Sequence, residues 1–99
     1  MATPVDIGSL ITRSPEIRGN RPRIAGTGVT VMRIAIYSSL GLAPEEIAAN
    51  YGHISLAQVH AALAYYYANR AEIDADIASE EAAAEALEHQ FGQNSEIRQ

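Results

Sequence analysis

The stretch HISLAQVHAALAYYYANR, residues 53–70, carries the clearest helix start in the chain. Ser55 and Gln58 have the spacing of a capping box, in which each residue hydrogen-bonds the backbone N–H of the other. Ile54 and Val59 have the spacing of a hydrophobic staple across the same boundary. The sequence therefore predicts a helix that begins directly after Ser55 and follows a tight turn.

Two shorter helices are predicted upstream of this turn. Residues 31–41 have a broad apolar face, with Thr30 as the N-cap and Gly41 where a left-handed residue commonly ends a helix. Residues 44–51 begin with Pro44, which suits the first helical position. Two helices joined by a tight turn and supported by a third form a helix-turn-helix unit, which places the last helix as the recognition helix.

Residues 9–31 contain short apolar stretches separated by proline and glycine, which predicts a β-hairpin. Gly26 and Gly28 follow the second predicted strand. A dinucleotide-binding loop would need a third glycine where Val31 stands, and a Walker loop would need a lysine, which the chain lacks. Two glycines alone favour a turn with positive φ at both positions.

Downstream of the turn, apolar residues continue at alternating spacings of three and four over residues 55–91. A continuous helix of that length would span about 55 Å, which a domain of this size cannot cover. We expect either a break near Asn69 or Ser79, or a distal half that packs on another chain. A third alternative is an alanine- and glutamate-rich helix that is partly frayed in solvent.

These elements predict a mainly α fold. A short N-terminal β-hairpin is followed by a tri-helical helix-turn-helix core, similar to a winged helix, and by a long C-terminal helix. The expected parts are an N-terminal arm, the hairpin and helix-turn-helix domain, an amphipathic helix for partner or dimer contact, and a disordered tail. Their boundaries are residues 1–8, 9–69, 70–91 and 92–99.

The charge of the chain is unevenly distributed. The formal net charge is −5, yet residues 1–33 contain five arginines against two acids and residues 34–99 contain ten acids against two arginines. Arginine is the only cation, and its guanidinium suits bidentate contacts with phosphate or carboxylate. Two interpretations stay open: an uneven solvated surface, or a basic face for a polyanion backed by an acidic face for another partner.

Several classes of function lose support from composition. The chain has no cysteine, so disulfides and thiolate metal sites are excluded. The histidines are widely spaced and share no helix face with a carboxylate, and no nucleophile stands beside a base, so we predict neither a metal, a cofactor nor an enzyme. No apolar run is long enough to span a membrane, and the N-terminal residues lack the pattern of a signal peptide, so a cytoplasmic protein is expected.

The order of the motifs resembles a known family. The segments SPEIRGNRPRIAGTGVTV, residues 14–31, and GLAPEEIAANYGHISLAQVHAALAYYYANRAEID, residues 41–74, look like the domain-of-unknown-function family 433, over residues 9 to about 75. The matching positions in the first segment are Gly19, Pro22, Ile24, Gly26 and Thr27. The departures are Asn20 for the second glycine, Gly28 for an arginine and Thr30 for a proline. The resemblance implies similarity to VapB-type antitoxins, which are encoded beside PIN-like ribonuclease toxins and have a winged or tri-helical DNA-binding core.

The resulting hypothesis is an antitoxin of a type II toxin–antitoxin system, which neutralises a PIN-like toxin and binds operator DNA as a homodimeric autorepressor. The alternative is a stand-alone DNA-binding regulator or a dimeric interaction module without a toxin. The expected DNA-binding residues are Arg13, Arg18, Arg21, Arg23, Arg33, Ser55, Gln58 and His60. The expected partner-binding residues are Tyr66, Arg70, Ile73, Ile77, Leu87 and Phe91.

Overall fold

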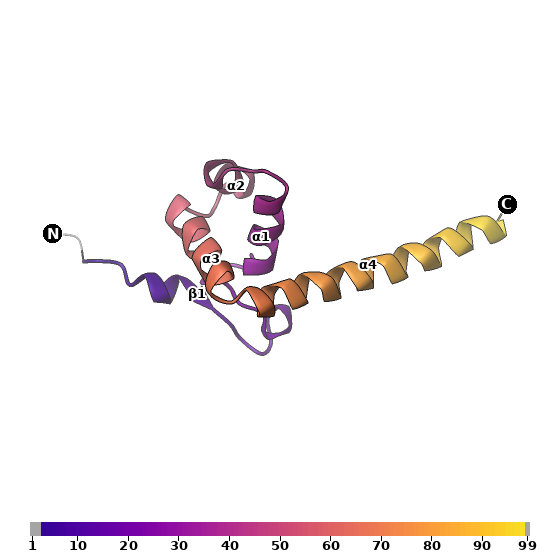
Figure 1. The fold of residues 1–99 in the computed structure, drawn as a ribbon, viewed down its shortest axis with the longest axis horizontal. Helices are drawn as coiled ribbons and strands as arrows, with labels where there is room; N and C mark the ends of the chain where they lie inside the picture. Colours follow the sequence, from indigo (N-terminus) through magenta and orange to yellow (C-terminus); the bar gives the residue numbers. More distant parts are fainter. Residues whose placement is uncertain (1–2, 99) are drawn as a thin grey trace.

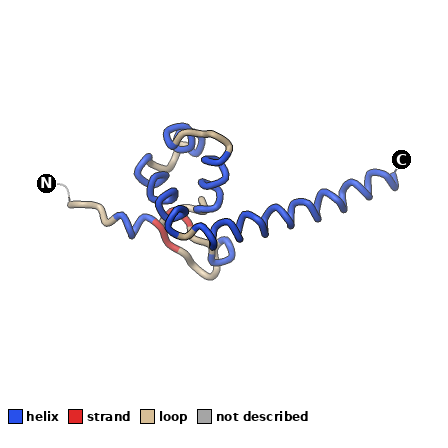
Figure 2. Tube along the Cα trace, in the orientation of Figure 1, coloured by secondary structure: helices blue, strands red, loops and turns tan. Residues whose placement is uncertain are grey.

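The computed structural model describes residues 3–98, and the side chains of residues 3–90. The fold is mainly helical, with one short antiparallel hairpin (Figures 1 and 2). In chain order the elements are the 3-10 helix η1 (Ile7–Leu10), β1 (Ile11–Thr12), the 3-10 helix η2 (Arg18–Asn20), β2 (Arg23–Ile24), α1 (Val31–Ser39), α2 (Pro44–Tyr51), α3 (Leu56–Ala68) and α4 (Arg70–Arg98).

Helices α1, α2 and α3 form a compact group with the hairpin, and we call this group the head. Helix α4 extends away from the head (Figure 1). The longest dimension is 67 Å, against 28 and 22 Å across. The four α-helices and β2 contribute to one core. The largest side chains buried there are Ile24, Ile34, Ile47, Ile73, Val31, Val59 and Pro22.

The predicted helix starts are confirmed. Thr30 caps α1 because its Oγ1 accepts from the backbone N–H of Arg33 at 3.2 Å. Ser55 and Gln58 form the predicted capping box of α3, with N···O distances of 3.1 and 2.7 Å. The turn between α2 and α3 begins at Gly52, whose φ of 76° is accessible to glycine without strain.

The long series of apolar residues at spacings of three and four, which we call the seam, is not one continuous helix. The helix breaks at Asn69, one of the two expected positions. Asn69 leaves the helical region with φ −134° and ψ 45°, and α4 starts again in a new direction. The new direction lays the first turns of α4 against α1, and Ile73 becomes completely buried in the core. The expectation that Ile73 and Ile77 need a partner outside the chain is therefore wrong, since Ile73 is in the core and Ile77 packs against it.

The backbone of α4 continues to Arg98, including residues 92–98 where a disordered tail was expected. Residue 99 lies outside the described part of the chain. So do the side chains from Phe91 onward, and Phe91 was one of the predicted partner-binding residues.

The hairpin pairs Ile11 with Ile24 and Thr12 with Arg23, and it packs on α3. Gly26 turns the chain with φ 78°, as predicted, but Gly28 does not have a positive φ. A Cβ at Gly28 would instead lie 3.0 Å from Nη2 of Arg18. Glycine thus suits position 28 because it leaves room for the side chain of Arg18, and not because it permits a turn.

Candidate interaction sites

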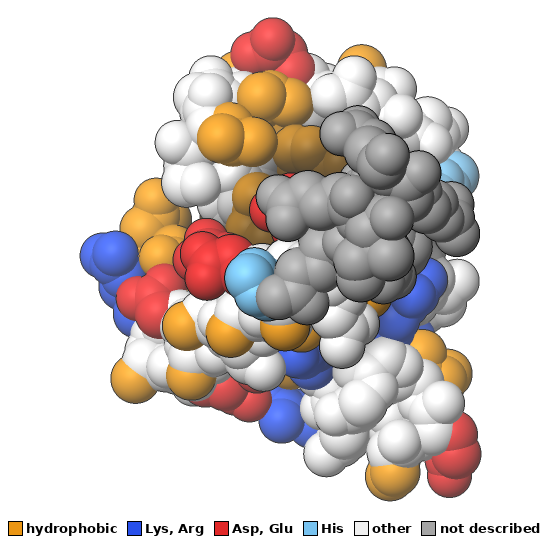
Figure 3. Space-filling model, turned by 90° about the vertical axis from the view of Figure 1, so that its right-hand side faces the viewer, with side chains coloured by type: hydrophobic (Ala, Val, Ile, Leu, Met, Phe, Trp, Pro, Cys, Tyr) orange, Lys and Arg blue, Asp and Glu red, His pale blue; other side chains and the backbone are white. Residues whose placement is uncertain are grey.

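Two of the five arginines in the N-terminal third, Arg13 and Arg21, form ion pairs with acids of the same chain. Arg21 lies between two carboxylates of α4: its Nη1 is 3.1 Å from Oε2 of Glu80 and its Nε is 3.8 Å from Oδ1 of Asp76. Seen along α4, basic and acidic side chains lie interspersed on the face toward the viewer (Figure 3). Part of the charge asymmetry in the sequence is therefore neutralised inside the molecule.

Arg13 joins β1 to both long helices. Its Nη2 donates to Oε2 of Glu72 at 2.7 Å and to the hydroxyl of Tyr65 at 2.6 Å, and Tyr65 donates to Oε1 of Glu72 at 3.1 Å. The hydrogen bonds with Glu72 and then Tyr65 raise the pKa of Arg13 above its ordinary value. We call the pairs of Arg13 and Arg21 with α4 the arginine clamp.

Arg23 is buried, with 7% of its surface exposed, which excludes it from the predicted DNA-facing surface. Its Nη1 donates to the carbonyl of Thr27 and its Nη2 to Oγ of Ser14, both at 3.0 Å. Its Nε has no hydrogen-bond partner among the described residues. The prediction for Arg23 as a DNA contact is wrong because the hairpin folds over its guanidinium.

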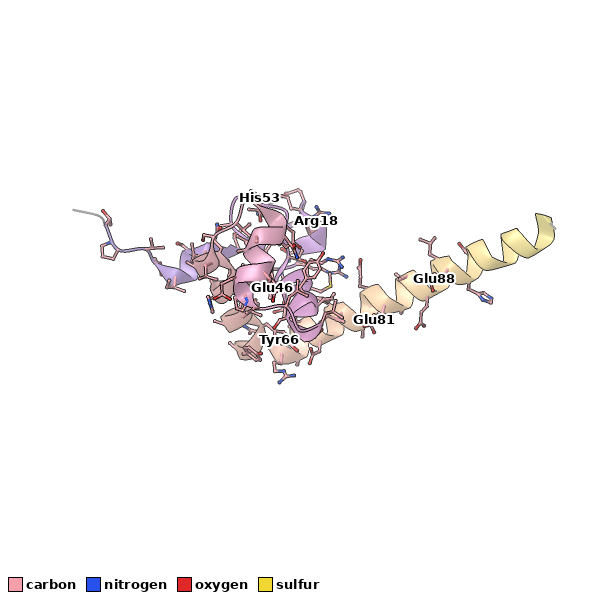
Figure 4. All side chains as sticks on the ribbon, turned by 90° about the horizontal axis from the view of Figure 1, so that it is seen from above. Arg18, Glu46, His53, Tyr66, Glu81 and Glu88 are labelled. Atoms are coloured by element: carbon pink, nitrogen blue, oxygen red, sulfur yellow. The ribbon has the colours of Figure 1, made fainter. Side chains whose placement is uncertain are left out.

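Three predicted DNA-binding arginines, Arg18, Arg21 and Arg33, line one cavity of about 480 Å³. The cavity lies between the start of α1, the turn after α2 and the head-facing side of α4, and His53 also lines it. Arg18 and His53 lie at the same edge of the head (Figure 4). The family pattern has an arginine at position 28. In this chain Nε of Arg18 donates to the carbonyl of Gly28 at 3.1 Å, so a guanidinium still occupies this corner.

Tyr51 forms an aromatic wall of the cavity. Its ring meets Tyr37 edge-on at 6.0 Å and His53 edge-on at 6.1 Å. Burial raises the pKa of Tyr51 above its ordinary value, Tyr37 adds to this rise, and the positive charge of Arg33 opposes it. Tyr51 is therefore neutral at physiological pH, and the positive charge facing the cavity comes from the arginines.

The predicted reading residues of α3 and its N-cap stay at the surface, with Ser55 and His60 exposed and Gln58 half-buried. Ser55 and Oε1 of Gln58 are occupied by the capping box, although the amide NH₂ of Gln58 is not. The side chains that α3 presents to solvent include His60, as predicted, and Tyr67, which is 62% exposed. His53 was missed as a candidate because its position does not stand out by spacing, whereas the tyrosine run already suggests that Tyr65 or Tyr67 faces a partner.

The predicted partner-binding residues fall into three groups. Ile73 belongs to the core, and the partly buried Ile77 packs against it. Tyr66 is half-buried and donates to Oδ1 of Asp74 at 2.9 Å, while Arg70 lies 5.4 Å from the centre of the Tyr66 ring in a cation–π contact. Leu87 is 55% exposed on α4, far from the head.

Residues 81–90 of α4, which we call the arm, are all exposed. Glu81, Glu85 and Glu88 follow one another at spacings of four and three residues, which aligns them on one helix face. Glu81 and Glu88 lie where α4 has left the head (Figure 4). The arm contains no arginine or lysine, so it presents a stripe of negative charge beside the apolar side chain of Leu87.

Within residues 3–98, no group of three or more histidines and carboxylates could hold a metal ion. No helix in the described part of the chain is long and apolar enough to span a membrane.

Comparison with known proteins identifies the family. The comparison with curated proteins gives no match. The crystal structure of a DUF433 member protein from Anabaena variabilis is similar, with 31% sequence identity and a TM-score of 0.67, over 71% of this chain and 69% of that chain. The family model described as "Protein of unknown function (DUF433)" matches residues 11–66, which is more than half of the chain. This chain therefore belongs to the DUF433 family.

Proposed function

We propose that the protein is the antitoxin of a type II toxin–antitoxin system. In this proposal the arm binds and neutralises a PIN-like ribonuclease toxin, and the head binds operator DNA and represses its own operon. The observation that carries the proposal is the fully exposed arm, with its acidic stripe and without an arginine or lysine.

The arm has the character of a recognition helix for a basic protein surface. The arm projects from the head, so its side chains are not buried against the head. Helical segments of this kind commonly become stable when they bind a partner. A ribonuclease must present positive charge to hold RNA, and carboxylates at helical spacing complement such a surface. Leu87 supplies an apolar contact within the same stretch.

The head supports DNA binding through its helix-turn-helix arrangement. The end of α2, the turn at Gly52 and the start of α3 follow one another as in that motif, and His60 lies on the exposed face of α3. Arg18 and Arg33 are the two arginines of the predicted set that are neither buried nor in the clamp. They remain the proposed phosphate contacts from that set.

A homodimer is part of this proposal, because two recognition helices are needed to read a palindromic operator. The hairpin does not require a second copy, since α3 covers it. Light scattering at tens of micromolar protein is expected to give twice the monomer mass, and a monomer would contradict this part.

The antitoxin activity is tested by growth rescue in cells that express the adjacent PIN-like ribonuclease gene. The variant Glu81→Gln/Glu85→Gln/Glu88→Gln is expected to lose rescue and co-purification with the nuclease, because the stripe loses its charge. Glu16→Gln/Glu45→Gln removes exposed acids from the head and is the matched control, which should rescue like the parent. Full rescue by the triple variant would place neutralisation elsewhere.

DNA binding is tested with a labelled fragment of the upstream region of the gene. Arg18→Ala/Arg33→Ala is expected to weaken binding to all sequences and to reduce its salt dependence, because fewer counterions are released. Arg70→Ala removes an arginine that stacks on Tyr66 and should bind like the parent. Equal affinity of all three proteins would contradict the proposed DNA face.

A further inference from the structure

The cavity beside α1 contains more positive charge than the rest of the molecule would suggest. The protein has a net charge of −5, yet three of its seven arginines line this cavity against a single carboxylate, Glu80. That carboxylate is paired with Arg21, 3.1 Å away, so these two charges offset each other at the side of α4. The remaining charge, from Arg18 and Arg33, is therefore available to an anion.

The fold positions the guanidinium groups in the cavity but leaves hydrogen-bond donors on them without partners among the described residues. Arg18 is positioned by the bond from its Nε to Gly28, and its terminal nitrogens make no hydrogen bond within the described residues. Arg33 makes no side-chain hydrogen bond or ion pair with any described residue, although it lies close enough to Tyr51 to lower the pKa of that hydroxyl. Two guanidinium groups that face one cavity in this way match the oxygens of a phosphate group.

His53 adds a third polar group to the same cavity. Its Nδ1 lies 2.9 Å from the carbonyl oxygen of Tyr51. A carbonyl oxygen can only accept, so Nδ1 carries the hydrogen and Nε2 is left over. Nε2 accepts from a hydroxyl when the ring is neutral and donates when the ring is protonated, so it can pair with a phosphate monoester or a sugar hydroxyl.

The cavity is also larger than a phosphate group requires and has an apolar side. Its volume of about 480 Å³ is in the range of small-molecule sites. Met32 and Tyr51 line it together with the polar groups. The edge-on contacts of Tyr51 with Tyr37 and His53 hold its ring in place. An organic group of nucleoside size can pack against this apolar side of the cavity while its phosphate contacts the arginines.

We propose that this cavity binds a phosphorylated ligand of about mononucleotide size, with Arg18, Arg33 and His53 at the phosphate. The contacts come from side chains, so the site needs no glycine-rich phosphate loop. The phosphate can come from a free nucleotide or from a nucleotide within a DNA strand. The proposal is independent of the toxin, because no residue of the arm lines the cavity.

The test is a titration of the full-length protein at low salt with adenosine 5′-monophosphate, inorganic phosphate and adenosine, followed by calorimetry and by NMR of the backbone amides. Saturable binding is expected for the nucleotide, weaker binding for phosphate and none for adenosine. Amide shifts should concentrate near residues 28–33 and 51–53. Absence of saturable binding of both the nucleotide and phosphate at millimolar concentration would overturn the proposal.

Arg33→Gln is the decisive variant, because this side chain makes no hydrogen bond that the fold needs. It is expected to weaken nucleotide binding about tenfold or more, the effect of losing a charged hydrogen bond. Arg70→Gln is the matched control and should bind like the parent. Equal binding by the parent and Arg33→Gln would overturn the site even if a nucleotide binds elsewhere.

A competition experiment distinguishes the two sources of the phosphate. If duplex DNA displaces the nucleotide from the parent protein, the cavity holds a phosphate of the DNA strand. If the nucleotide stays bound in the presence of excess duplex DNA, the ligand is a free nucleotide. Either outcome supports the phosphate site, whereas failure of the growth-rescue experiment leaves this measurement unaffected.

Discussion

The part of α4 whose side chains are described, residues 70–90, has two halves with similar composition and opposite roles. Residues 70–80 and residues 81–90 are both rich in alanine and acids and belong to one helix. The first half buries Ile73 completely and places Glu72, Asp76 and Glu80 against arginines of the head. In the second half every residue is exposed.

The comparison shows that acidic residues at helical spacing do not reveal their role by themselves. Three acids of the first half bind Arg13 and Arg21 within the chain and the fourth, Asp74, accepts from Tyr66, so they belong to the fold. The acids of the second half have no arginine or lysine near them along the helix, so they are available to another molecule. The boundary between the two roles lies next to Glu80, where α4 leaves the head.

The largest effect is expected from truncations on either side of this boundary. A chain that ends at Asn69 loses Ile73 and all partners of the arginine clamp, and we expect it to lose cooperative unfolding, since small domains are stable by only about 5–15 kcal/mol. A chain that ends at Glu80 should unfold within about 1 kcal/mol of the parent, since exposed residues contribute little. Circular dichroism during urea unfolding measures both, and equal loss of stability would contradict the boundary.

A substitution of one apolar residue in each half gives the next largest effect. Ile73→Ala leaves a cavity in the core and is expected to lower the free energy of unfolding by about 2–5 kcal/mol. Leu87→Ala, in the arm, should change it by no more than about 0.5 kcal/mol. Urea unfolding measures the free energy of unfolding of both variants. A similar loss at both positions would mean that Leu87 is buried against other residues and that the arm is not exposed.

The arginine clamp should contribute less than the core. Arg21→Ala separates Asp76 and Glu80 from their cation, and the free energy of unfolding should fall by about 1 kcal/mol or less, since these side chains are only partly shielded from water. The loss should shrink at high salt because screening weakens the pairs in the parent. Glu85→Gln in the arm is the control without a partner arginine, and an equal effect there would show that the clamp is not selective.

The smallest effect concerns the head alone and appears only in alkali. The folded-state pKa of Tyr51 lies above its ordinary value of 10.0, so the unfolded chain releases this proton first as pH rises. Stability from this group is complete below pH 10 and is lost as pH rises toward the folded-state pKa. Tyr51→Phe should therefore flatten the fall in stability above pH 10. Tyr67→Phe, at an exposed position, is the matched substitution, and the same flattening there would contradict the assignment.

The sequence by itself determined the local elements of this protein. Thr30, Pro44 and the Ser55–Gln58 pair mark helix starts through contacts within four residues, so their chemistry can be read along the chain. The break near Asn69 was one of two open positions, and the long seam could not distinguish them because both halves have the same spacing. The family, too, could be inferred from the order of its motifs.

Only the tertiary structure decided which charged and apolar side chains are free. Arg23 became buried and Arg21 became paired through residues more than fifty positions away or through the closing of the hairpin, and no local pattern encodes such contacts. The turn at Asn69 redirected α4, so Ile73 joined the core and the exposed stretch began only after Glu80. The cavity with Arg18, Arg33 and His53 arises in the same way, because three segments distant in sequence meet only when the helices pack.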